Sequence, residues 1–321
     1  MKKQLTQTMP SERLQDSRKA TLWNRMLKQI KKNYILYLFI LPTIIWYILF
    51  CYMPMGGIYI AFTRYKGVGS IFDAKFVGLK WFKNFFESAY ASSTIRNTLR
   101  ISLYSLVTFP LPIIMALLLN EIRIEKFKKT AQTIMYAPHF VSLVVMVSVM
   151  TLLLDSGGMV NNVIQKFGGE PINFMGSSDA FPHLFVWSGL WQSLGWDCII
   201  YLAALSGVDP GLHEAATIDG CTRFKRILHI NLPAISPTIV ITLIMRVGKL
   251  MNISTEKTLL LRNNLNLATS ETIGTFVYNR GLIAGDFGYA AAVGLFLNVI
   301  NLILLLIVNE VSKKVSDTSL F

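Results

Sequence analysis

The residues that most often carry out enzymatic chemistry are present, but their spacing builds no recognisable catalytic or metal site. The four histidines are scattered and show no His-Glu-x-x-His or Cys/His ligand spacing. The three cysteines lie far apart and are interpreted as reduced, apolar side chains. Gly248-Lys249 precedes Leu250, so it does not complete a G-x-x-x-x-G-K-[ST] phosphate loop. We therefore expect no catalytic residue, no bound metal and no enzymatic activity, and ATP hydrolysis would need a separate subunit.

Chemistry of a different kind is indicated by ionisable residues inside apolar stretches. Asp197 falls within the stretch 181–208, and Arg246 and Lys249 fall within 237–261. At about 1.5 Å per residue, Asp197 and Arg246 lie at similar depths, roughly 13–15 Å, in two antiparallel helices. An ionisable residue in a membrane segment is a functional-site hypothesis. Two interpretations stay open: Asp197 forms a structural ion pair with Arg246 or Lys249, or these residues line a solute path.

The solute-path interpretation adds polar and aromatic candidates. Sugars are commonly held by aromatic faces together with hydrogen-bonding groups, so Gln192, Trp196 and Asn252 are the candidate solute contacts. A tryptophan near the end of a span is more often an interfacial anchor, which suits Trp187 better than Trp196. Helical periodicity places five polar residues of the stretch 237–261 on one side of the helix, within an arc of about 120°. They are Thr242, Arg246, Lys249, Asn252 and Glu256.

These candidates must be positioned by membrane helices, because six stretches reach the roughly 20 apolar residues that cross a bilayer. Backbone groups in hydrocarbon must be hydrogen-bonded within their own segment, so each stretch is predicted to be a helix. The first is not a signal peptide, since it begins at residue 33 and no small-residue cleavage site follows it. The six stretches are 33–63, 101–120, 130–154, 181–208, 237–261 and 287–309.

The 31 lysines and arginines are distributed unevenly between these spans. With both ends cytoplasmic, 18 lie in cytoplasmic segments, which agrees with the positive-inside rule. The basic residues before the first span fix orientation and contact anionic lipid, so the net charge of +13 requires no nucleic-acid partner. The outer segment 64–96 is expected to be either an amphipathic helix or a packed loop. We predict a cytoplasmic tail at 1–33, a six-helix membrane domain at 34–311 and a second cytoplasmic tail at 312–321.

The segment 207–236, between the fourth and fifth spans, has the features of a rigid docking surface. A turn at 209–211 leads into a short helix, which Asp219-Gly220 ends because glycine accepts a left-handed backbone. Thr222 is placed to cap a second short helix over 223–230. Small side chains in this helix-turn-helix allow another surface to approach closely.

This segment resembles the EAA loop of permease subunits in binding-protein-dependent ABC importers. The matching elements keep their register over about 20 residues, in the loop where that family has them. Cys221 replaces the more usual alanine, which is a small change. The matching residues are Glu214, Ala215, Ala216, Asp219, Gly220, Leu232 and Pro233.

The resemblance extends over about residues 30–321 and points to the sugar-type branch, closest to permeases for complex oligosaccharides and polysaccharide fragments. In the first half, the matching residues are 76–79, Trp81, Asn97-Thr98, Gly158 and Asn161. In the C-terminal part they are 271–273, Tyr278, 281–282, 285–287, 292–296, 315–316 and 319–321.

The resemblance implies an all-α membrane protein with the type I ABC importer permease fold and a cytoplasmic coupling loop. It implies a multi-pass subunit of a bacterial cell membrane that forms half of the path for a carbohydrate. The implied partners are a second permease in a heterodimer, two cytoplasmic ATPase subunits that hold ATP and Mg²⁺, an extracellular solute-binding protein and membrane lipid. This chain itself is expected to bind no cofactor. The alternatives are an ABC permease for another solute, such as a peptide, and an ion-gradient-driven secondary transporter.

Overall fold

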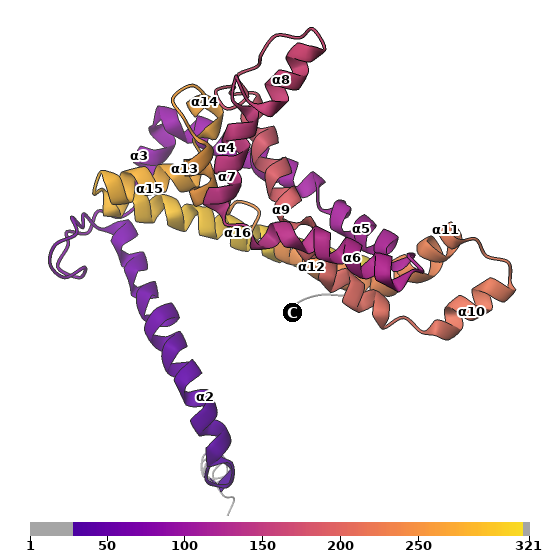
Figure 1. Cartoon of the computed structure of the whole chain (residues 1–321). Coiled ribbons are helices and arrows are strands. Elements are labelled where there is room, and N and C mark those ends of the chain that lie inside the picture. The colour runs from indigo at the N-terminus through magenta and orange to yellow at the C-terminus, as the bar shows by residue number, and fades with distance from the viewer. Residues whose placement is uncertain (1–27, 317–321) are drawn as a thin grey trace, which may run out of the picture. The chain divides into compact units, whose positions relative to one another are not determined.

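The structure, a computed structural model, describes residues 28–316, and within that range every regular element is a helix (Figure 1). The one extended contact in this range is an isolated antiparallel bridge between Thr63 and Phe76. The predicted all-α class is therefore confirmed. The chain divides into two compact units, residues up to Ile58 and residues from Tyr59 onward, which are described separately.

The first unit is an apolar helix. It comprises α2 (Tyr34–Tyr47) and a π-helical turn (Ile48–Tyr52), and a 3-10 helix (Met53–Phe62) continues from it into the second unit. None of the residues of α2 is buried, although nearly all of them are apolar. A helix that is apolar on every side is typical of a segment surrounded by lipid. Together these elements form one stretch long and apolar enough to cross a membrane.

The second unit contains the other helices, several of them interrupted. The first half has α3 (Lys80–Glu87), α4 (Ala89–Val107), α5 (Pro110–Asn120), α6 (Glu125–Tyr136), a 3-10 turn (Ala137–Phe140), α7 (Leu143–Leu154) and α8 (Met159–Lys166). The second half starts with α9 (Ala180–Ser206), α10 (Pro210–Ile218), α11 (Arg223–Arg226), a π-helical turn (Ile227–Asn231) and α12 (Leu232–Val247). It ends with α13 (Thr255–Leu261), α14 (Leu267–Ser270), α15 (Ile273–Tyr278), a π-helical turn (Asn279–Ile283) and α16 (Phe287–Ser316).

Three clusters of buried apolar side chains hold the second unit together. The first joins α5, α9 and α12, with Ala116, Cys198 and Ile235 fully buried. The second joins α4, α7, α9 and α13, and the third joins α3, α4, α15 and α16. Helices α6 and α9 approach so closely at Gly195 that an added Cβ would collide with the carbonyl oxygen of Met135. A side chain at this position would therefore force the two helices apart.

Several residues that carry the family resemblance hold loops in place. The side-chain amide of Asn97 donates to the carbonyl oxygens of Ala268 and Glu271, at 2.9 and 3.0 Å. The buried side chain of Asn161 fixes the loop after α8, because its amide nitrogen donates to Ile172 O and its oxygen accepts from Ile172 N. Backbone groups inside a protein need hydrogen-bond partners, and these two asparagine side chains supply them, so their role is to stabilise the fold.

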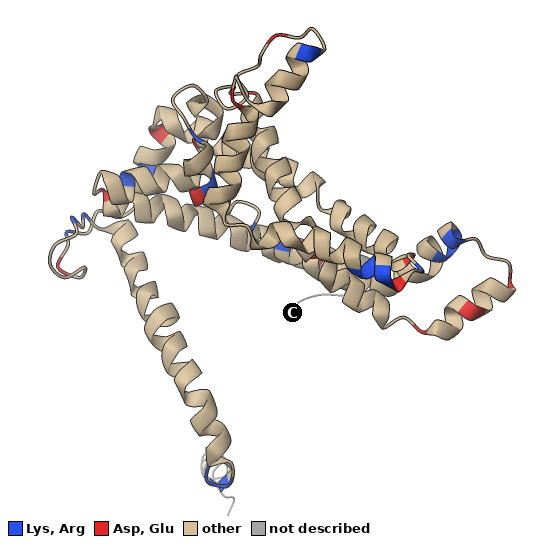
Figure 2. Cartoon of the chain, in the orientation of Figure 1, with Lys and Arg blue, Asp and Glu red and all other residues tan. Residues whose placement is uncertain are grey.

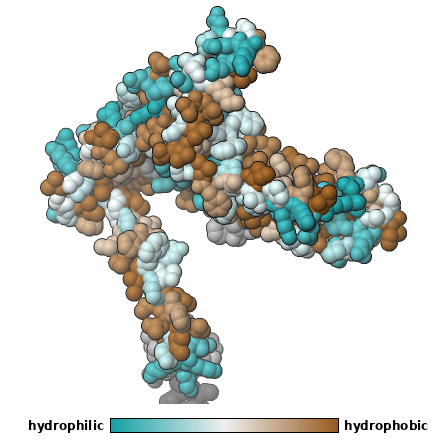
Figure 3. Space-filling model, in the orientation of Figure 1, coloured by the Kyte–Doolittle hydropathy of each residue, from teal (hydrophilic) through white to brown (hydrophobic). Residues whose placement is uncertain are grey.

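Within residues 28–316, five helical stretches are long and apolar enough to cross a membrane: 34–62, 89–120, 143–166, 223–247 and 287–314. Helix α9 coincides with the fourth predicted span, 181–208, and has 27 residues, about 40 Å of helix, but it is not one of these five stretches. Figure 3 shows hydrophobic side chains over much of the visible surface of the long helices and hydrophilic ones at the α8 end. The number six remains a prediction from the sequence.

Some of the predicted boundaries differ from the structure. The stretch 237–261 is not one helix, because α12 ends at Val247 and α13 begins at Thr255. The stretch 130–154 is interrupted between the 3-10 turn and α7. In the outer segment, α3 and the start of α4 follow an irregular stretch over 64–79. Helix α16 runs through Ser316, beyond the boundary predicted at 311. Most of the predicted tails, 1–27 and 317–321, lie outside the described residues.

Candidate functional site

The segment 207–236 forms a helix-turn-helix whose first half is α10. The Asp209 carboxylate accepts a hydrogen bond from Gly211 N at 2.9 Å and thereby caps the helix. At the other end, Gly220 has a φ of 73° and lies in the left-handed region. Gly220 N donates to Thr217 O and Cys221 N donates to Ala216 O, which together form a Schellman C-cap. The predicted end of the helix at Asp219-Gly220 is confirmed.

The second half of the segment is attached to the first. The Thr222 side chain accepts from Lys225 N, which confirms the predicted cap of α11. The guanidinium of Arg226 donates to the hydroxyl of Thr217 at 2.8 Å and so joins the two helices. The second helix does not stop at residue 230 as predicted, because α11 passes through the π-helical turn 227–231 into α12. Leu232 and Pro233 therefore lie at the start of α12, directly after the π-helical turn and within one continuous helical run.

This helix-turn-helix exposes apolar side chains at its tip. Ile218 is 87% exposed, Phe224 is 69% exposed and Leu212 is 52% exposed. Glu214, Ala215, Asp219 and Gly220 are also exposed, and Ala216 is half-buried. In Figures 1 and 2, α10 and α11 extend beyond the ends of α5, α6 and α12, with acidic residues on α10 and basic residues on α11. Large exposed apolar side chains beside charged ones are typical of a surface that binds a protein.

A second candidate site surrounds the interruption between α12 and α13. Residues 248–254 are not helical, although they directly follow a helical stretch that is long and apolar enough to cross a membrane. Non-helical backbone at membrane depth is tolerated where it is buried in protein or lines a water-filled cavity. A cavity of about 610 Å³ lies at this position, lined by α4, α9, Arg246 at the end of α12, the interrupted segment and Lys257 of α13.

Side chains from other helices bond to the backbone of the interrupted segment. Ser102 of α4 donates to Leu250 O at 2.5 Å. Asn301 of α16 accepts from Met251 N, and its amide nitrogen donates to the side chain of Asn252, both at 3.0 Å. These bonds replace those that a continuous helix would make, so the interruption is a stable part of the fold.

Two of the three predicted solute contacts line this cavity. They are Gln192 of α9 and Asn252, and the predicted cation Lys249 lines it with them. Gln192 also donates to Val141 O at 2.7 Å, at the interruption before α7. Its role is therefore at least partly structural.

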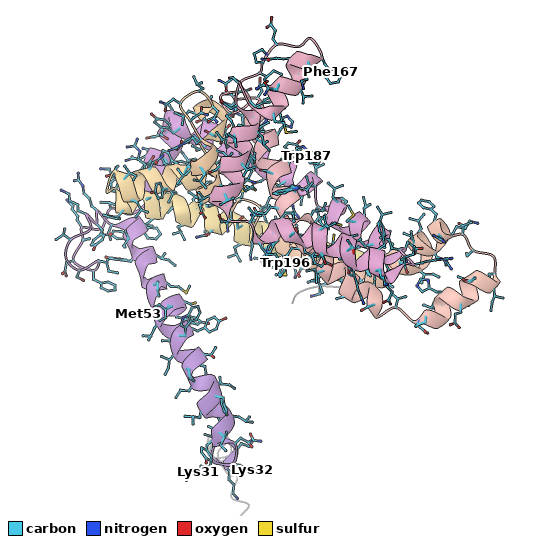
Figure 4. All side chains as sticks on the ribbon, in the orientation of Figure 1. Lys31, Lys32, Met53, Phe167, Trp187 and Trp196 are labelled. Atoms are coloured by element: carbon cyan, nitrogen blue, oxygen red, sulfur yellow. The ribbon has the colours of Figure 1, made fainter. Side chains whose placement is uncertain are left out.

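Trp196, the third predicted contact, does not line the 610 Å³ cavity. Its ring stacks on His139, with centroids 4.3 Å apart and an interplanar angle of 4°. Trp187, which lies on the same helix, donates to the hydroxyl of Tyr104 at 2.6 Å. Figure 4 labels both tryptophans along α9, with Trp196 beside the run from α6 to the 3-10 turn. Trp196 instead lines a smaller cavity of about 270 Å³.

The expected ion pair of Asp197 is not formed among the residues that the structure describes. Asp197 and Arg246 both line the 270 Å³ cavity, but Asp197 accepts from Ser193 at 3.0 Å. Arg246 donates to Ser105 O at 2.9 Å and to the Thr108 hydroxyl at 3.3 Å. Because α4 ends at Val107, the guanidinium bonds to one carbonyl and one hydroxyl at a helix C-terminus, where a cation is stabilised by the helix dipole. This environment takes the place of a carboxylate partner.

Comparison with known proteins places this arrangement in a family. The model of the family "Binding-protein-dependent transport system inner membrane component" matches residues 88–317. The chain belongs to this family.

This permease also resembles individual members. It is 42% identical over 298 residues to the polygalacturonan/rhamnogalacturonan transport system permease protein YteP of Bacillus subtilis, covering 92% of each chain. It is 28% identical to the arabinooligosaccharides transport system permease protein AraP of the same organism, covering 88% of each chain. A chain in the crystal structure of a bacterial alginate ABC transporter, in complex with alginate pentasaccharide-bound periplasmic protein, superposes with a TM-score of 0.86 at 35% identity. That match covers 92% of the permease and 100% of the other chain, which confirms the predicted fold.

The sequence analysis missed two groups of cavity residues in this permease. Lys257 was not singled out from the sequence, although its side chain is buried against α9. Ser102 and Ser105 were passed over as ordinary positions of an apolar span. Their spacing of three residues places them on one face of a helix, which is a usable signal.

Proposed function

We propose that this chain is the transmembrane subunit of an ATP-driven importer and forms half of the translocation path for an oligosaccharide or polysaccharide fragment. The support is its family membership, together with relatives that are named as transporters of polygalacturonan, rhamnogalacturonan and arabinooligosaccharides. The path would pass through the cavity at the interrupted helix, where hydroxyl, amide and ammonium groups face the same space.

The coupling role is proposed for the segment 207–236, and one observation carries it. The two halves of the segment are joined by the Arg226–Thr217 hydrogen bond and a Schellman turn, and the second half is continuous with α12. A rigid element continuous with a spanning helix can transmit a rigid-body displacement. An ATPase that displaced α10 would therefore also displace α12, including its C-terminal end, which carries Arg246.

The proposed partners follow from the same mechanism. Two ATPase subunits would bind the segment 207–236 and hold ATP and Mg²⁺, because this sequence has no phosphate-binding loop. A second permease would complete the path, and an extracellular binding protein would deliver the solute. The multi-pass chain would lie in the bacterial cell membrane with the segment 207–236 and both termini in the cytoplasm, as the distribution of cations predicts.

The test compares two apolar side chains of equal exposure. Ile218 in the coupling segment is 87% exposed, and Phe167 next to α8 is 88% exposed. We expect Ile218→Asp to abolish co-purification of the ATPase and ATP-driven uptake in proteoliposomes that contain the complete transporter. Phe167→Asp should leave co-purification unchanged. Full ATPase binding by Ile218→Asp would refute the coupling role, and uptake without any ATPase would support a secondary transporter.

The solute class needs a separate measurement. Uptake of labelled oligosaccharides and of labelled tripeptides is measured in the same proteoliposomes. Uptake of a peptide but of no glycan would show that the solute is a peptide and not a carbohydrate. The proposed coupling role would not be affected by that result.

A further inference from the structure

Two cavities lie one after the other between α9 and α12, and they share one residue. On α9, residues up to Ser193 line the cavity of about 610 Å³, and residues from Trp196 onward line the cavity of about 270 Å³. The smaller cavity is therefore the one nearer to the segment 207–236. Arg246 of α12 lines both cavities, and among the described residues no other is common to the two linings. Arg246 thus forms the partition between the two spaces.

In this structure Arg246 is held by the junction of α4 and α5. Its guanidinium donates to Ser105 O at 2.9 Å and to the Thr108 hydroxyl at 3.3 Å. It also lies 5.9 Å from the centroid of the Phe109 ring. These partners are all neutral, so they compensate the buried charge only in part. Together they fasten the C-terminal end of α12 to the end of α4.

A carboxylate lies on the opposite wall of the smaller cavity. Asp197 lines that cavity together with Arg246, but it bonds to Ser193 of its own helix, at 3.0 Å. Among the described residues, this is the one hydrogen bond that the carboxylate accepts. Arg246 therefore has two alternative sets of acceptors, one at the end of α4 and one on α9, and here it uses the first.

The backbone next to Arg246 allows a change of partner. Helix α12 ends at Val247, and residues 248–254 join it to α13 without regular helix. This connection is anchored by side chains of α4 and α16, but the anchored groups are those of Leu250 and Met251. The end of α12 is free to turn about the residues before this anchor, in the manner of a hinge, while α13 keeps its place.

From this geometry we infer that Arg246 is a two-position gate in the translocation path, and that Asp197 receives its guanidinium when α12 is displaced. The inference depends on the proposed function, because an ATPase acting on the segment 207–236 supplies the displacement. In the first position, the one described here, the guanidinium separates the cavities. In the second position it leaves the α4–α5 junction, where Thr108 lines the larger cavity and Phe109 the smaller one. A passage then opens along that junction, and the charge-assisted bond to Asp197 offsets the loss of the α4 contacts.

The test measures the distance between the ends of α4 and α12 in the complete transporter, reconstituted in nanodiscs. Nitroxide labels are attached through Val107→Cys and Met245→Cys, at positions that are 73% and 50% exposed. Of the native cysteines, Cys51 and Cys221 are replaced by serine and alanine, whereas Cys198 is buried. Distances are recorded by pulsed electron paramagnetic resonance without nucleotide, and with ATP and a hydrolysis-deficient ATPase. We expect one main distance without nucleotide and a second, displaced population with ATP.

Two substitutions of unchanged size should shift these populations in opposite directions. Asp197→Asn keeps an acceptor for Ser193 but removes the charge that receives Arg246. The displaced population with ATP, and the rate of uptake, should therefore fall at least about tenfold. Thr108→Val removes an acceptor from the first position, so the displaced population without nucleotide should rise about threefold or more.

Matched controls exist for both substitutions. Asp155→Asn changes an exposed acid at the end of α7, and Thr151→Val removes a hydroxyl that bonds to Val147 O of its own helix. Neither control should change the populations. In an Arg246→Gln background, Asp197→Asn should have no further effect, because the carboxylate then has no guanidinium to receive. The thermal transition of each complex reports whether the variant folds.

Three results would each overturn the gate. They are the absence of a second distance with ATP, equal populations in wild type and Asp197→Asn, and a shift in the same direction by Asp197→Asn and Thr108→Val. The proposed function is decided separately, by ATPase co-purification and ATP-driven glycan uptake. A transporter that imports glycan equally well with Asp197→Asn would retain that function and refute the gate.

Discussion

Substitution of Gly220 tests the coupling role that we propose for the segment 207–236. Its φ of 73° is unfavourable for any residue with a Cβ, and an added Cβ would meet no atom within 4 Å. The expected effect of Gly220→Ala is therefore purely conformational, about 1–2 kcal/mol for an L-residue in the left-handed region. That penalty corresponds to roughly a 5–30-fold decrease in the population of the native turn relative to alternatives.

A graded series of variants separates conformation from size. Asparagine tolerates the left-handed region better than alanine, and valine tolerates it least, so ATPase affinity should fall in the order Gly, Asn, Ala, Val. The matched control is Gly207→Ala in the same segment, because Gly207 has a φ of −87° and an added Cβ would make an ordinary 3.5 Å contact. The assay is titration of the ATPase subunits onto the permease complex in nanodiscs.

The conformational argument predicts about a 5–30-fold weaker ATPase affinity for Gly220→Ala if the native turn is only marginally stable, and no change for Gly207→Ala. Equal affinity of wild type and Gly220→Val would refute the idea that the Schellman turn positions α10 for docking. An equally large effect at Gly207 would show that any substitution in the segment disrupts binding, whatever its backbone conformation.

Four further substitutions test the packing of the second unit by the thermal transition of the purified complex. Gly195→Val should destabilise it by about 1–3 kcal/mol or prevent folding, because the side chain would collide with a carbonyl of α6. Asn231→Leu should leave stability unchanged or raise it by about 1–3 kcal/mol. Asn231 is fully buried, and neither polar atom of its side-chain amide has a hydrogen-bond partner among the described residues. A large loss of stability would contradict this expectation. Gln192→Ala should destabilise by about 1–3 kcal/mol, more than Asp197→Asn does, because only Gln192 satisfies a backbone carbonyl outside its own helix, that of Val141 before α7. The reverse order would favour the ion pair of Asp197.

The all-helical fold could be predicted from the sequence because hydropathy is a local property. A stretch of about 20 residues without charge is sufficient to indicate a membrane helix, whatever lies beside it. The turn at Gly220 and the cap at Thr222 could be predicted for the same reason, since each depends on a few neighbouring residues.

The interruption between α12 and α13 could not be predicted in this way. The interruption is of mixed composition, since Leu250, Met251 and Ile253 are apolar whereas Gly248, Lys249, Asn252 and Ser254 are not, and this mixture does not specify where a helix ends. The bonds that stabilise the interruption come from Ser102 and Asn301, which are separated from it by 148 and 50 residues in the sequence. A local pattern contains no information about partners at such distances.

The absence of the Asp197–Arg246 ion pair, one of the two interpretations of these residues, has a related cause. The depths of Asp197 and Arg246 were estimated on continuous helices, and both residues do line one cavity. The guanidinium nevertheless bonds to Ser105 O, because the end of α4 offers carbonyl groups there. The competing acceptor arises from another helix interruption. Pro110 and Pro112 indicate a kink there, but they do not indicate which side chain bonds to the freed groups.

The helix interruptions in the second unit also explain which polar residues remain available to a solute. Each of three interruptions is bonded by a side chain from another helix: Arg246 to Ser105 O, Gln192 to Val141 O and Ser102 to Leu250 O. Side chains committed to backbone groups are expensive to release, since a buried carbonyl left unsatisfied costs about 1–3 kcal/mol. Polar lining groups without such a commitment, above all the exposed Lys249, can exchange partners as the solute passes. Substitutions at committed positions should therefore impair assembly, whereas Lys249 should affect selectivity alone.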